Sequence, residues 1–153
     1  MKHILLIILL IFSAFQANAQ RYDLGDQISP DADKLKLLGI SSETNVSTYK
    51  YIGTINENMF GRKIGDIIVG VKNGRVVTTI YNIIPLSGEK GVPKSFVDAV
   101  QKALPFPLAY RNGVYGVNID NESIAISRVK NMMTFDKDRI VLYNSIKASV
   151  LRD

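Results

Sequence analysis

Apolar residues form one continuous block at the start of the chain and short periodic groups after it. Residues 4–12 are all apolar, Lys2 and His3 precede them, and Ala17-Asn18-Ala19 follows shortly after. This order is that of a secretory signal peptide, and the block is far shorter than the roughly 20 residues that cross a bilayer. We therefore predict a cleavable signal peptide of bacterial type at residues 1–19 and a single exported domain, without a membrane span, at residues 20–153.

Two later segments have the features of helices. Residues 29–39 begin with Ser29-Pro30, carry acidic residues next and end at Gly39. These are the start and stop signals of a helix of two to three turns. Residues 93–104 have the three- and four-residue apolar spacing of an amphipathic helix, at Phe96, Val97, Val100 and Leu104.

Six segments have the composition and periodicity of strands. Asn73-Gly74 separates two of them, and this dipeptide readily adopts the two positive φ angles of a type I′ hairpin. The polar residues 120–123 predict a second hairpin turn. The predicted strands are residues 49–55, 67–71, 76–84, 115–119, 124–129 and 139–144.

The predicted order is one helix and three strands, followed by the same series again. Pro30 and Pro93, which open the two helices, lie 63 positions apart (93 − 30). Such a spacing indicates an internal duplication. We therefore expect an α+β fold of two α-β-β-β units, whose strands form one antiparallel sheet with both helices on a single face. The order resembles that of beta-lactamase-inhibitor-like and outer-membrane-assembly-lipoprotein-like domains, and this resemblance implies a bare sheet face that docks another protein.

The composition after residue 19 excludes several kinds of chemistry. The chain has no cysteine, and its one histidine is His3. The predicted mature chain therefore lacks Ser-His and Cys-His nucleophile pairs, and the usual ligands of zinc, copper, haem and iron–sulfur centres. Lysine and arginine outnumber acidic residues, which favours an acidic partner. They are scattered along the chain, whereas nucleic-acid binders usually concentrate them on one face. We expect no cofactor and no metal.

Carboxylates are the remaining candidates for chemistry. Asp31-Ala32-Asp33 and Asp136-Lys137-Asp138 have the two-residue spacing of a calcium loop, but helix capping and surface charge explain these pairs more simply. A hydrolase that uses two carboxylates stays open as a less favoured alternative. Its candidate residues are Glu57, Asp66, Glu89, Asp98 and Glu122.

Aromatic residues are the main candidates for contact with a partner. Tyrosine is enriched at protein interfaces, although it also packs well within a sheet. Residues 105–113 contain two prolines and predict a stiff loop that either presents its apolar residues or covers the edge of the core. The predicted partner-binding residues are Tyr49, Tyr51, Tyr81, Phe106, Tyr110, Arg111, Tyr115 and Tyr143.

These observations favour a non-catalytic periplasmic or secreted protein that binds another protein or an envelope component. Inhibitors, immunity proteins and envelope accessory proteins are of this kind. A carrier of a small apolar ligand is the main alternative, and the sequence leaves the oligomeric state open.

Overall fold

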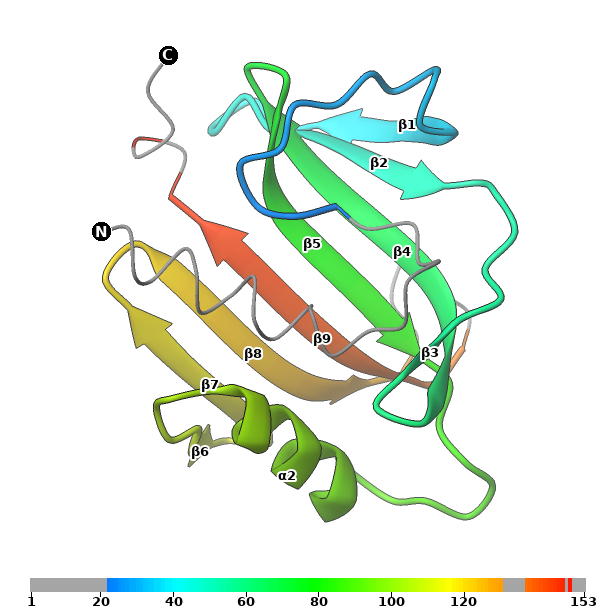
Figure 1. Ribbon diagram of the computed structural model, residues 1–153, viewed down its shortest axis with the longest axis vertical. Helices are drawn as coiled ribbons and strands as arrows, with labels where there is room; N and C mark the ends of the chain where they lie inside the picture. Colours follow the sequence, from blue (N-terminus) through cyan, green and yellow to red (C-terminus); the bar gives the residue numbers. More distant parts are fainter. Residues whose placement is uncertain (1–21, 131–136, 148, 150–153) are drawn as a thin grey trace.

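The computed structural model describes residues 22–130, 137–147 and 149. The predicted signal peptide and Asp136 lie outside these residues. The described chain forms one helix, α2 (Lys94–Ala103), and nine strands of one antiparallel sheet (Figure 1). The strands are β1 (Leu35–Ile40), β2 (Ser47–Tyr51), β3 (Asn58–Met59), β4 (Arg62–Lys72), β5 (Arg75–Ile83), β6 (Ala109–Arg111), β7 (Val114–Ile119), β8 (Glu122–Val129) and β9 (Arg139–Ile146).

Hairpins build most of the sheet, and one long-range pairing joins its two halves. The strand order is β1-β2-β4-β5-β9-β8-β7-β6, and β3 pairs with β4 outside this path. The predicted hairpin at Asn73-Gly74 is confirmed, because the two residues have φ angles of 52° and 72° between paired Lys72 and Arg75. In the middle of the sheet, β5 pairs with β9 from Thr78 opposite Ser145 to Ile83 opposite Ile140.

The expected α+β fold of two α-β-β-β units is wrong, because the first unit has no helix. Residues 30–34 form turns, and residues 35–40 are strand β1, which pairs with β2. Leu35 and Leu37 stand opposite Tyr51 and Tyr49, so apolar residues two apart extend one face of the sheet. Lys34, with a φ angle of 55°, interrupts any helix across this segment. The resemblance to inhibitor-like domains rested on the order of elements and loses that basis.

The second predicted helix is confirmed at α2. Its residues Phe96, Val97 and Val100 are buried, and Phe96 meets Phe60 edge to face with ring centroids 5.7 Å apart. The predicted loop after it is partly wrong, since residues 109–111 form strand β6. Asn112 and Gly113 both have positive φ and turn the chain from β6 into β7.

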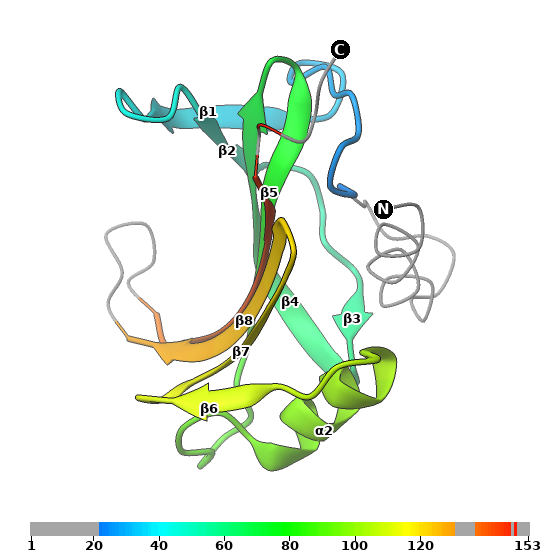
Figure 2. The same ribbon diagram turned by 90° about the vertical axis from the view of Figure 1, so that its left-hand side faces the viewer.

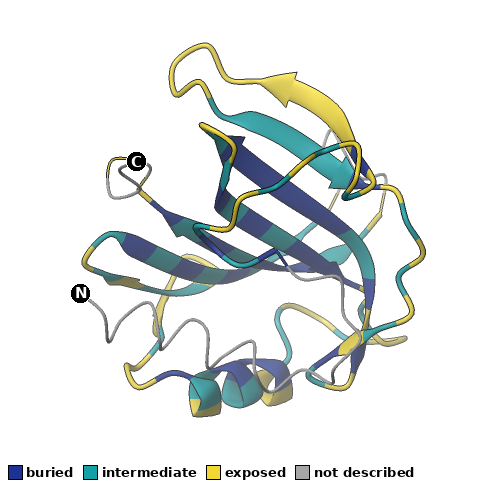
Figure 3. Cartoon of the chain, turned by 45° about the horizontal axis from the view of Figure 1, so that its top comes forward, coloured by how far each residue is buried: buried dark blue, intermediate teal, exposed yellow. Residues whose placement is uncertain are grey.

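The other predicted strands have shifted ends but are present. The segment predicted at 49–55 is β2 at Ser47–Tyr51, and the last strand continues to Ile146. Figure 3 shows the buried residues along β4 and β5 and the exposed residues along β1, at the edge of the sheet.

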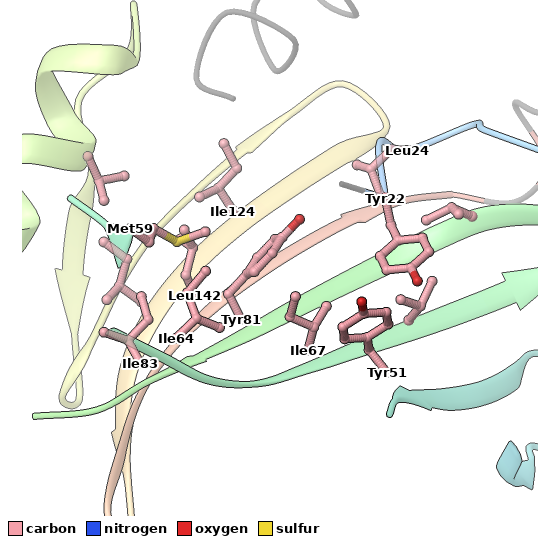
Figure 4. Close-up of a cluster of buried hydrophobic side chains, with 14 of the residues drawn as sticks. Tyr22, Leu24, Tyr51, Met59, Ile64, Ile67, Tyr81, Ile83, Ile124 and Leu142 are labelled. Carbon is pink, nitrogen blue, oxygen red and sulfur yellow. The ribbon is translucent and has the colours of Figure 1, made fainter. Parts of the chain in front are cut away.

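One face of the sheet, called the core face here, carries the main hydrophobic core. Cross-strand partners share a face, so the register places Ile67, Tyr81, Leu142 and Ile126 in one row on it. Figure 4 shows several of these side chains on the same side of their strands. The core face packs against residues 22–24, β3 and α2, and the two ends of the sheet bend toward the opposite side (Figure 2).

Candidate functional site

The opposite side of the sheet, called the open face here, differs from the core face in its exposure. The strand register defines it as three rows of residues that run across the strands. The first row is Ala109, Gly116, Ala125, Tyr143, Ile80, Ile68 and Lys50; the second is Asn118, Ser123, Ser145, Thr78, Gly70 and Thr48; the third is Ser127, Val141, Asn82 and Asp66.

Most residues of the open face are half-exposed, whereas those of the core face are largely buried. Ile68 and Val141 are buried but do not belong to the main core cluster. Among the described residues, α2 and β3 both lie on the other side of the sheet (Figure 2). Within the described chain, the helix therefore covers part of the core face and leaves the open face uncovered.

The rows of the open face differ in polarity. The first row has the larger apolar side chains, Ile68, Ile80 and Tyr143, and its remaining positions are mostly Ala and Gly. The second row consists of hydroxyl and amide residues around Gly70. A Cβ atom at Gly70 would lie 3.2 Å from Val46 Cγ1 and 3.1 Å from Thr78 Cβ, so glycine allows Val46 to lie close against β4. The first row therefore forms an apolar strip that the polar residues of the second and third rows flank.

Charged residues on this side are mostly basic. Lys50 Nζ lies 2.6 Å from Asp66 Oδ1, which pairs the one acidic residue of the open face. Arg139 and Arg111 lie two residues from Val141 and Ala109, so they point to the same side as these residues. A Cβ atom at Gly65 would lie 3.0 Å from Arg139 Nε, so the arginine crosses the sheet toward β4.

A buried amide lies among these residues. Asn82 is 0 % exposed, and neither its Nδ2 nor its Oδ1 atom has a hydrogen-bond partner among the residues that the structure describes. The Nε atom of Arg139, on the neighbouring strand, is also buried and finds no partner in the described part of the chain. A buried polar group without a hydrogen bond costs about 1–3 kcal/mol. We therefore expect a stability cost at this part of the open face.

The structure divides the predicted tyrosines between the two faces. Tyr51 and Tyr81 are buried in the core, with 7 % and 3 % exposure, and Tyr49 and Tyr115 are half-buried against it. Among the predicted tyrosines, Tyr143 belongs to the open face.

Three other predicted residues gather at the β6 edge of the sheet. Tyr110 is 62 % exposed and packs on Tyr115 with ring centroids 4.7 Å apart, and Phe106 is 40 % exposed. The Gln101 side chain donates to the Phe106 carbonyl oxygen and accepts from the Leu108 amide, at 2.9 Å and 2.7 Å. The loop is therefore held in place, and Arg111 is exposed beside it.

Sequence reasoning missed the residues of the open face that lie on β5. Thr78, Ile80 and Asn82 occupy every second position of a strand that was predicted correctly. Their alternation could have grouped them, because successive side chains of a strand point to opposite faces. The sequence did not show which of the two groups faces the core.

The candidate carboxylates of a hydrolase lie on different elements, and three of them form ion pairs. Asp66 pairs with Lys50, Glu89 with Arg62 and Asp98 with Lys94. The hydrogen bond from Arg62 lowers the pKa of Glu89, whereas burial, followed by the charge of Asp120, raises the pKa of Glu122 to about 7.

The two carboxylate pairs with calcium-loop spacing form hydrogen bonds and an ion pair where they are described. Asp33 accepts a hydrogen bond from the Ser29 amide, and Asp138 binds Arg128. Within residues 22–130, 137–147 and 149, no three acidic side chains form a group that could hold a metal ion.

Comparison with known proteins gives no relative for this chain. No family model, no curated protein and no solved structure matches it. The helix in the described part of the chain is too short and too polar to cross a membrane.

Proposed function

We propose that this is a non-catalytic, exported protein that binds another protein through its open face, as an inhibitor, immunity protein or envelope accessory protein would. The observation that carries the proposal is the apolar strip of half-exposed Ile80 and Tyr143, beside the buried Ile68, on a sheet face without a covering helix in the described chain. When one face of an antiparallel sheet is exposed to solvent, the residues on that face are usually polar. Protein interfaces instead combine an apolar centre with a polar rim, as the open face does.

The charge and shape of the open face indicate the kind of partner. The basic residues on this side of the sheet include Lys50, Arg111 and Arg139. They outnumber the one acidic residue of the open face, Asp66, which forms a salt bridge with Lys50. The ends of the sheet bend toward this side, so the surface is concave (Figure 2). A projecting acidic surface of another protein complements both features.

The chemistry of the side chains supports binding over catalysis. The chain has no cysteine and its histidine is His3, so nucleophile pairs with imidazole or thiol are missing from residues 20–153. Three of the five candidate carboxylates are held by basic side chains. A repeatedly repurified protein that still turned over a substrate would contradict this part of the proposal.

Site-specific photo-crosslinking tests the proposed surface. A benzophenone amino acid is placed at Ile80 or Ser127 on the open face and, as a control, at Leu86, which is 60 % exposed in a loop. The proteins are irradiated in an envelope extract of the source cells. We expect one reproducible protein adduct from both open-face positions, and its absence from the Leu86 protein.

The affinity of open-face variants for the recovered partner then distinguishes a binding contact from chance proximity. Ile80→Lys and Tyr143→Glu place charges in the apolar strip, and we expect each to weaken binding by about 2 kcal/mol or more. Equal adducts at all three positions, or unchanged affinity in both variants, would refute the proposal.

A further inference from the structure

Exposed apolar side chains concentrate at the β1 edge of the sheet. The described residues include nine exposed large apolar side chains, and four of these lie on β1 or directly after β2. Their exposures range from 43 % to 63 %, and the residues are Leu37, Leu38, Ile40 and Ile52. No other part of the described chain exposes as many large apolar side chains.

The backbone of β1 is also open on its outer side. The Ile52 amide donates to the Lys34 carbonyl oxygen and the Ser41 amide to the Val46 carbonyl oxygen, both at 2.9 Å. These two bonds determine which residues of β1 direct their backbone amide and carbonyl groups toward β2. The alternation of an antiparallel ladder then directs the amide and carbonyl groups of Leu37 and Ile40 away from β2. Since β1 ends the strand order, no described strand pairs with them.

The two sides of β1 have different chemistry. Leu37 and Ile40 stand opposite Tyr49 and Ser47, on the side of the core face. Lys36 stands opposite Lys50, on the side of the open face. A strand placed next to β1 would meet apolar side chains on one side and a basic side chain on the other. An incoming strand in which apolar and acidic residues alternate would place apolar side chains against Leu37 and Ile40 and an acidic side chain against Lys36.

Pairing with a second copy of the chain is less favourable. Lys36 places a positive charge on the edge, and a second copy would bring the same charge to it. Proteins use lysine on edge strands to prevent their sheet edges from pairing with one another. Lys36 forms no ion pair within the described residues, so an acidic side chain on an incoming strand would supply its partner.

We propose that β1 accepts an extended segment of a partner protein, with alternating apolar and acidic residues, as an additional strand of the sheet. Backbone hydrogen bonds to Leu37 and Ile40 provide the pairing, and contact with Lys36 provides the charge preference. This proposal uses the edge of the sheet and does not require the open face to bind a partner.

Two synthetic peptides test the proposal directly. The first is acetyl-Val-Glu-Val-Glu-Val-Glu-Val-amide, and the second has lysine in place of glutamate. Each is titrated into the ¹⁵N-labelled protein, and amide shifts and hydrogen exchange are recorded. We expect the acidic peptide to bind about tenfold more tightly, with slower exchange at the Leu37 and Ile40 amides. Lys36→Glu should reverse the preference, and Lys90→Glu in an exposed loop is the matched control.

Several outcomes would overturn the proposal. These are equal affinity for the two peptides, shifts confined to the open face, unchanged exchange at Leu37 and Ile40, or no binding at millimolar peptide. The double variant Leu37→Asp and Ile40→Asp changes exposed positions only, so it should fold and lose the peptide. Sedimentation showing a dimer that this variant dissolves would assign the edge to a second copy of the chain instead.

Discussion

Glu122 gives a prediction in which the effect of one substitution changes with pH. It is the first residue of β8, it is 6 % exposed, and no described residue forms a hydrogen bond with its Oε2 atom. Burial and the neighbouring charge of Asp120 raise its pKa from 4.5 to about 7. Glu122→Gln keeps the shape of the side chain and removes the charge. We predict that the variant is more stable than the parent protein above pH 7 and equally stable near pH 4.

The sign and size follow from the two protonation states. Below the unfolded value of 4.5, the Glu122 carboxyl is protonated in both the folded and the unfolded chain. As the pH rises to about 7, the unfolded chain releases the proton while the folded chain retains it, so stability falls. At 1.36 kcal/mol per pH unit, this difference corresponds to a loss of about 3 kcal/mol. That is a large part of the roughly 5–15 kcal/mol that stabilises a typical domain.

Urea unfolding of both proteins at about pH 4, 6 and 8.5 measures the effect. Few other groups interfere, because the one histidine is His3 and because arginine partners lower the pKa values of Glu89 and Asp138. These two carboxylates lose their stabilising effect only as the pH falls through their lowered pKa values. The exposed Glu43→Gln is the control for loss of a negative charge. A stability difference of the same size at all three pH values would refute the reasoning.

Three further substitutions test other features of the fold. Asn82→Leu should raise the free energy of unfolding by about 1–2 kcal/mol, because it removes a buried amide without partners; a loss of stability would mean that the amide is satisfied in solution. Glu89→Gln should cost about 2–3 kcal/mol and speed hydrogen exchange at the Leu86 amide, because it weakens the ionic contact of the buried Arg62 guanidinium; a cost below about 0.5 kcal/mol would contradict this. Gly74→Ala should cost about 1 kcal/mol at a φ of 72°, whereas Gly39→Ala, which has open space and no positive φ, should not.

The parts of the fold that sequence could predict depend on local signals. The Asn73-Gly74 turn sets its own hairpin, and the apolar spacing of α2 is visible within ten residues. The segment at Ser29 carried the signals of a helix start, but pairing with β2 decided its conformation. Strand β6 was missed although Asn112-Gly113 is the same turn signal, because Pro105 and Pro107 indicated a loop.

The candidate site depended on strand register, which the sequence does not show. Tyr81-Asn82 and Tyr143-Asn144 have the same letters at corresponding ends of two strands. In the sheet, Tyr81 stands opposite Leu142 and Ile80 opposite Tyr143. The first tyrosine therefore faces the core, and the second lies on the open face. A register change of one residue exchanges the two faces, so identical dipeptides take opposite roles.

The pairing of β5 with β9 has a consequence for how the chain is made. During synthesis, and again during the proposed export, β1 to β5 emerge well before residues 139–146, which complete the central ladder. Until then, the inner edge of β5 has no neighbour, although its side chains already include Val77, Tyr81 and Ile83. Contacts across so many residues form slowly, and unpaired apolar edges associate with other nascent chains. A holding chaperone that shields β5 during this interval should therefore increase the yield of native protein.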